Sequence, residues 1–169
     1  MRASVYRTGI GILLVALACA AGELNAAGGV VVIGNANLTR LDATTLEKIY
    51  TGKVIEVEGK PVTAVNANSG SAIRNRFLQA FLNQDEDKYT AYWTVRRYIG
   101  KGASPREMSS SADVIKFVQS TPGAIGYSGM GYATPDVKTL RIARKAGDPA
   151  VAPTVETTLN QTYPIARPL

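Results

Sequence analysis

The residues best placed for chemistry are the polar run Asn68, Ser69, Gly70 and Ser71, followed one helical turn later by Arg74. The run comes after an apolar extended segment and before a helical pattern, so we expect it to be the loop in which a helix begins. The first backbone N–H groups of a helix have no intrahelical partner, and the helix dipole places positive charge beside them. These four residues therefore predict an anion-binding loop, with Arg74 as the candidate counter-charge.

A simpler interpretation needs no ligand. Asparagine and serine are the side chains that most often cap the first turn of a helix, so Asn68 or Ser69 would act only as an N-cap. The local sequence leaves both interpretations open, and the position of the loop in the fold has to separate them.

The flanking segments predict how the loop is held. Residues 61–65 are expected to form a strand with Val62 and Val65 in the core, and residues 71–83 to form a helix. Arg74 and Arg76 lie off the apolar stripe of that helix, toward solvent or a cleft. In α/β sheets ligands bind beyond the carboxyl ends of strands, and the loop occupies such a position. The helical stripe consists of Ile73, Phe77, Ala80 and Phe81.

The rest of the chain alternates strand-like and helix-like segments. Such alternation predicts an α/β fold in which a mixed sheet is flanked by helices. Asp42 is the expected cap of the first helix, Gly52 its stop, and Gly59 a turn within an extended segment. Further strands are predicted at 30–33, 124–127 and 137–143, further helices at 42–52, 85–97 and 110–121, and irregular structure at 98–106 and 147–169.

The N-terminus has the composition of an export signal. Arg2 and Arg7 precede a short apolar run at 10–21, and small residues follow it. The run is shorter than the about 20 residues that a membrane span needs. We therefore expect a signal peptide at 1–27, cleaved after Ala20 or near Ala27, a single domain at 28–169, and a periplasmic location.

Cys19 is the only cysteine and lies inside this leader. A lipid anchor on Cys19 is the alternative, but Ala16 stands where a larger aliphatic residue is expected. The domain after the leader would then contain no cysteine, so its core is expected to be stable without a disulfide.

The charge balance and the missing residue types restrict the function. The formal net charge is +6, which favours anionic ligands or envelope surfaces, while the scattered basic residues do not form a nucleic-acid-binding motif. The sequence contains no histidine. It also contains no metal-ligand cluster or nucleophile motif, and Ser69 and Ser71 have no visible base. A non-enzymatic protein without metal or cofactor is predicted.

Four stretches of the sequence together resemble the periplasmic phosphate-binding proteins of ABC transporters, and more closely short one-lobed secreted proteins related to them. The most specific is 122–127, Pro-Gly-Ala-Ile-Gly-Tyr, with the helix before it. The resemblance covers roughly residues 30–169 and implies one lobe of a type II periplasmic-binding-protein-like fold. The four stretches are 46–53, 68–71, 114–127 and 163–165.

The resemblance implies that Ser69, Gly70 and Ser71 match the loop that binds phosphate. Full-length family members place an arginine shortly before this loop, near the position of Val65, and they complete the site with a second lobe. Neither feature is recognisable in this sequence. An open half-site of this kind is expected to bind phosphate only around the millimolar range, unless Arg74, Lys101 or a partner completes it.

Two functional hypotheses follow. The first is a secreted solute-binding-like protein that recognises phosphate or a phosphate-bearing ligand, with the permease of an ABC transporter or a second copy of the chain as its candidate partner. The second is an envelope interaction or assembly module that kept the fold and lost ligand transport. Neither hypothesis includes nucleic acid or a stable membrane span.

Overall fold

The computed structural model describes residues 29–36, 38, 40–132 and 137–164. The expected leader at 1–27, Cys19 and the last residues of the chain lie outside the described residues. Among the helices that are described, none is long and apolar enough to span a membrane.

The centre of the fold is a five-stranded sheet in the order β6-β5-β7-β1-β8. Strand β1 (Val30–Gly34) is antiparallel to both β7 (Ala124–Gly129) and β8 (Lys138–Thr139). Strand β5 (Thr63–Ala67) is parallel to β7 and to β6 (Arg106–Met108). The predicted mixed sheet is thus confirmed.

The continuous β-branched run of β1 is buried along its whole length, because both faces of the sheet are covered. Val30 and Val32 point into a large core on one face, while Val31 and Ile33 point into a smaller core on the other. Each core lies between one face of the sheet and the helices that cover that face.

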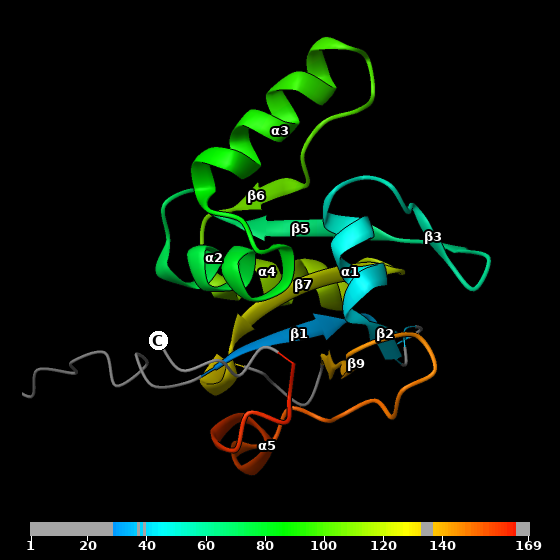
Figure 1. The fold of residues 1–169 in the computed structure, drawn as a ribbon, viewed down its shortest axis with the longest axis vertical. Coiled ribbons are helices and arrows are strands. Elements are labelled where there is room, and N and C mark those ends of the chain that lie inside the picture. The colour runs from blue at the N-terminus through cyan, green and yellow to red at the C-terminus, as the bar shows by residue number, and fades with distance from the viewer. Residues whose placement is uncertain (1–28, 37, 39, 133–136, 165–169) are drawn as a thin grey trace, which may run out of the picture.

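Helices α1 (Ala43–Tyr50) and α2 (Ala72–Phe77) cover the first face, and α4 (Ser111–Ser120) covers the second (Figure 1). Helix α3 (Glu86–Tyr98) contributes Tyr89 and Trp93 to the first core through one side. The rest of α3 extends beyond the sheet (Figure 1).

The predicted helix ends are confirmed where the sequence carries a capping side chain. The carboxylate of Asp42 accepts a hydrogen bond from the backbone N–H of Thr45 at 2.8 Å and so caps α1. Helix α1 ends at Tyr50, and Gly52 follows with φ of +67°. Ser110 caps α4 through the N–H of Asp113.

The predicted helix at 71–83 is not one regular α-helix. After α2 the chain widens into a π-helical turn, η1 (Leu78–Leu82), which ends at Asn83 with φ of +50°. Two adjacent pairs of large apolar side chains from α2 and η1 are buried in the first core. The four buried side chains are Phe77, Leu78, Phe81 and Leu82.

The strand expected at 137–143 is two strands that belong to different sheets. Strand β8 joins the central sheet, and Leu140 is buried between it and β9 (Arg141–Ala143). Strand β9 pairs in parallel with β2 (Arg40–Asp42), which the sequence did not indicate. The chain divides into two strands at Leu140 because β8 pairs with β1 of the central sheet, whereas β9 pairs with β2, which is distant in the sequence.

Three further segments differ from expectation. The extended segment before β5 is a hairpin of β3 (Glu56–Val57) and β4 (Lys60–Pro61), which confirms the predicted turn at Gly59, but β5 begins two residues later than predicted. Strand β6 was missed because it has only three residues. Helix α5 (Val155–Leu159), which Thr154 caps, lies where irregular structure was expected. A short 3₁₀ turn, η2 (Met130–Tyr132), follows β7.

Candidate functional site

The loop Asn68–Ser71 lies at the carboxyl end of β5, as the sequence predicts, and leads directly into α2. Asn68, Ser69 and Gly70 are exposed. Gly70 has φ of +76° and open space around it, so the loop makes its tight turn at a position that glycine adopts without strain. The loop is therefore accessible to a ligand.

Ser71 is the residue that caps α2. Its hydroxyl accepts a hydrogen bond from the backbone N–H of Arg74 at 3.4 Å and donates one to the carbonyl of Asn68 at 2.8 Å. The simpler interpretation named Asn68 or Ser69 as the cap, and that assignment was wrong. The side chain of Ser69 is consequently available for another role.

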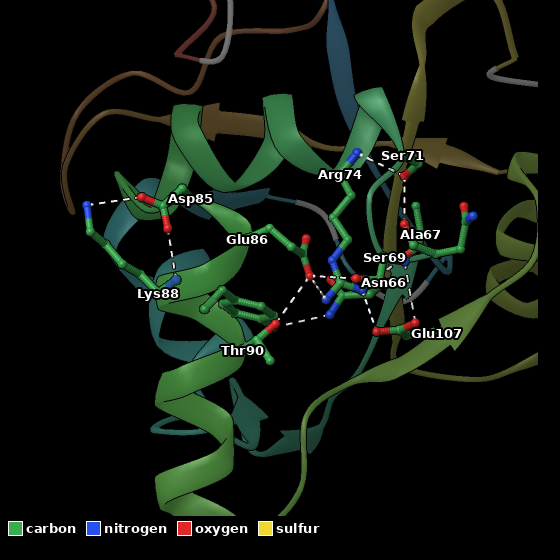
Figure 2. A network of polar contacts seen from close by, with 12 residues as sticks. Asn66, Ala67, Ser69, Ser71, Arg74, Asp85, Glu86, Lys88, Thr90 and Glu107 are labelled. Atoms are coloured by element: carbon green, nitrogen blue, oxygen red, sulfur yellow. Dashed lines mark hydrogen bonds and ion pairs between the residues drawn. The ribbon is translucent and has the colours of Figure 1, made fainter.

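Arg74 turns inward beneath the loop and is only 3% exposed. Its guanidinium donates to the carbonyl of Ala67 at 3.0 Å, to Oε1 of Glu107 at 2.6 Å and to Oε1 of Glu86 at 2.7 Å (Figure 2). An orientation of Arg74 toward solvent is thus ruled out. Its guanidinium lies against the end of β5, where it contacts the carbonyl of Ala67, among the residues drawn in Figure 2.

The same two carboxylates also bind Ser69. Its backbone N–H donates to Oε2 of Glu107 at 3.4 Å, and its hydroxyl donates to Oε1 of Glu86 at 2.9 Å. Glu86 comes from the first turn of α3 and Glu107 from the middle of β6. Two of the residues predicted to bind an anion, Ser69 and Arg74, therefore donate to two internal carboxylates (Figure 2).

The charges in this group are unequal, with one guanidinium facing two carboxylates. Burial alone would lower the pKa of Arg74, but the hydrogen bond and charge of Glu107 and those of Glu86 raise it, so Arg74 stays protonated. The side chain of Glu107 is 46% exposed and that of Glu86 is 21% exposed. Glu107 is therefore the carboxylate that can turn away from Arg74 with less movement of the surrounding residues.

A buried polar layer fixes the strand beneath the loop. The side chain of Asn66 donates to the hydroxyl of Tyr89 at 3.2 Å and accepts from that of Tyr127 at 3.3 Å. The Tyr127 hydroxyl in turn accepts the N–H of Ala67 at 3.1 Å, and the Tyr89 hydroxyl donates to the carbonyl of Tyr50 at 3.0 Å. These contacts orient the end of β5, from which the loop starts.

Burial raises the pKa of four tyrosines, and this predicts a loss of stability in alkali. An acid whose folded pKa lies above its unfolded pKa, about 10 for tyrosine, stabilises the fold below that pH and ceases to do so above it. We expect the protein to unfold progressively above pH 10, and Tyr163→Phe to shift the transition upward. The part of the tyrosinate absorbance that comes from these buried rings should change together with the circular dichroism; complete ionisation near pH 10 in a folded protein would contradict this. The four tyrosines whose pKa is raised by burial are Tyr50, Tyr89, Tyr127 and Tyr163.

Sequence reasoning missed both carboxylates of the site. Glu86 was visible only as an acid that complements the dipole of α3, and Glu107 gave no signal because β6 was not predicted. Lys101, an expected alternative to Arg74, is exposed in the turn after α3, where its backbone pairs with Arg96. Neither of these Lys101 contacts is made with the loop.

A cavity of about 200 Å³ adjoins the site between α3 and the segment that leads into β6. Arg74 and Glu107 line it together with Arg97 and Ser104. The part of the chain that the structure describes contains no group of acidic, histidine or cysteine side chains arranged for a metal ion.

Residues 20–169 match the family model described as PBP superfamily domain. The chain is 43% identical to the phosphate-binding protein PstS of Pseudomonas aeruginosa over an aligned stretch of 61 residues. This stretch covers 36% of this chain and 19% of that protein. The chain thus spans only a small part of the curated relative that it matches.

Solved structures give the same fold over a longer stretch. An ABC-type phosphate transport receptor from Vibrio cholerae aligns with a TM-score of 0.63 at 16% identity, over 82% of this chain and 53% of that one. PstS from Borrelia burgdorferi aligns with a TM-score of 0.63 at 19% identity, over 82% of this chain and 54% of that one. A putative phosphate ABC transporter substrate-binding protein with bound phosphate, from Clostridium perfringens, aligns with a TM-score of 0.63 at 21% identity. The alignment covers 80% of this chain and 51% of that one. The chain therefore has the fold of about half of each of these proteins, as expected for one lobe.

Proposed function

Because this chain belongs to the PBP superfamily domain family, we propose that it is a non-enzymatic solute-binding-like protein that recognises phosphate or a phosphate-bearing ligand. The proposed site is the loop Asn68, Ser69, Gly70 and Ser71 together with Arg74. The names of the relatives, which are phosphate-binding proteins and phosphate transport receptors, support this ligand class.

The observation that carries the proposal is the position of Glu107. One of its oxygens accepts from the guanidinium of Arg74 and the other from the N–H of Ser69, at 2.6 and 3.4 Å. A carboxylate held in this way makes the contacts that two oxygens of a phosphate would make. We infer that phosphate binds by displacing Glu107 from Arg74 and Ser69.

The rest of the site suits such an exchange. Glu107 is half-exposed and can turn toward water, whereas Glu86 is held by Ser69 and accepts a further hydrogen bond from Thr90 at 3.4 Å. Each hydrogen bond to a charged ligand contributes about 1.5–3 kcal/mol, against an association cost of about 4 kcal/mol or more. The internal competitor lowers the net affinity further, so binding by the chain alone is expected to be weak.

The proposal is tested by titrating phosphate into the protein and into Glu107→Gln by calorimetry. Glutamine keeps the shape of the side chain but competes less strongly for Arg74, so we expect phosphate binding to become about tenfold tighter. Glu56→Gln, an exposed carboxylate on β3, is the matched control and should leave the affinity unchanged. Absence of binding in both proteins at high millimolar phosphate, or equal affinities, would refute the proposal.

We also propose that residues 1–27 direct export and that a partner closes the open side of the site. The partner would be a transporter permease or a second copy of this chain. Fractionation of expressing cells and the mass of the exported form test the leader. Tighter phosphate binding at higher protein concentration would support closure by a second copy.

A further inference from the structure

The C-terminal end of α3 carries apolar side chains that face solvent. Val95, Tyr98 and Ile99 are 59%, 91% and 56% exposed. Their spacing of three and four residues places them on one side of the helix end. Figure 1 shows this end of α3 and the turn after it at the extremity of the molecule, away from the sheet. These side chains therefore form a convex apolar surface.

This surface is held in place by the structure beneath it. The guanidinium of Arg96 donates to the carbonyls of Gly52 and Lys101 at 3.1 and 2.9 Å, and it stacks over the rings of Tyr92 and Trp93. The N–H of Lys101 donates back to the carbonyl of Arg96 at 2.8 Å. Docking would therefore require little additional ordering of the backbone.

The charged residues of 89–106, which include most of α3 and the turn after it, are all basic. The sequence contains no aspartate or glutamate between Lys88 and Glu107. Lys101 is exposed in the turn that follows the apolar side chains, and Arg97 is exposed on another side of the same helix end, where it also lines the cavity beside Glu107, whereas Arg96 is engaged in the contacts just described. An anionic partner is thus the one that complements this surface.

We propose that Val95, Tyr98 and Ile99, together with Arg97 and Lys101, form a docking tip for an anionic phospholipid surface. Three apolar side chains on a convex end cover much less than the roughly 800 Å² per partner of a stable protein interface. Lipid headgroups adapt to a convex tip, and tyrosine places its ring and hydroxyl favourably at the boundary between hydrocarbon and water. Arg97 and Lys101 would contact the anionic headgroups.

The test measures partition onto vesicles of phosphatidylglycerol and phosphatidylcholine against vesicles of phosphatidylcholine alone. The protein is purified after export and its mass determined, because a retained leader would bind lipid by itself. Tyr98→Ser/Ile99→Ser is expected to lower partition onto the anionic vesicles about tenfold. Arg97→Gln/Lys101→Gln is expected to lower it about twentyfold, and added salt should weaken binding by the unmodified protein.

Matched controls lie on other surfaces of the molecule. Ile55→Ser removes a side chain that is 72% exposed beside β3, and Lys116→Gln removes an exposed cation of α4. Both are expected to partition as the unmodified protein does. Equal binding to neutral and anionic vesicles, or unchanged partition of the tip variants, would overturn the proposal. Self-association that Tyr98→Ser abolishes would instead assign the tip to contact with a second copy.

Discussion

Arg74→Ala is expected to lower the free energy of unfolding by about 3 kcal/mol and to abolish phosphate binding. Removal of a buried cation leaves its partner carboxylates close together without compensation, which is more costly than the intact ion pair is worth. Glu107 is half-exposed and can turn toward water, so the loss should lie near the lower end of the range for broken buried pairs. Urea denaturation of the variant measures the change.

Two further proteins make this result interpretable. Arg97→Ala removes an exposed arginine near the same cavity and should change the unfolding free energy by less than about 0.5 kcal/mol. Arg74→Met combined with Glu86→Gln and Glu107→Gln removes all three charges and should recover most of the lost stability. If the triple variant is no more stable than Arg74→Ala, unpaired carboxylates are not the cause.

Gly123→Ala is expected to destabilise the protein by about 3 kcal/mol or more. Gly123 has φ of +75°, and a Cβ atom there would lie 2.2 Å from the backbone carbonyl oxygen of Pro61. The strained backbone and the overlap each cost about 1–3 kcal/mol, and the neighbouring carbonyl belongs to backbone that cannot rotate away. Thermal or urea unfolding provides the measurement.

Gly59→Ala separates the two contributions. Gly59 has nearly the same backbone conformation, with φ of +74°, but nothing lies within 4 Å of the added methyl group. Its loss of stability should therefore be about 1 kcal/mol, from the backbone alone. Similar losses for Gly59→Ala and Gly123→Ala would show that the contact with Pro61 is not tight in solution.

Gly123 also illustrates how far the sequence reaches. From the sequence alone, the glycines at 123, 126, 129 and 131 indicate that backbone passes close to something, either a neighbouring element or a ligand. The structure assigns Gly123 to a neighbouring element, because the oxygen of Pro61 lies against it. Gly126 likewise makes room for Val114 and Val118 of α4.

Elements with a local cause were predictable. The caps at Asp42 and Ser110, the buried run of β1 and the aromatic face of α3 all follow from residues that are neighbours in the chain. The two-residue and three-residue strands were not predictable, since a short strand is defined by its partner. The break at Leu140 is the clearest case, because β8 and β9 pair with strands about 100 residues away in the chain.

By itself, the sequence determined the fold class, the place of the loop Asn68–Ser71 after a strand and before a helix, and the presence of Arg74 one turn later. Only the tertiary structure decided what these groups contact. Glu86 and Glu107 reach the loop from α3 and β6, which lie beside it because β6 pairs with β5 and α3 packs on the core. Helical periodicity placed Arg74 off the apolar stripe, but it could not show that two distant carboxylates would hold its charge in a buried position.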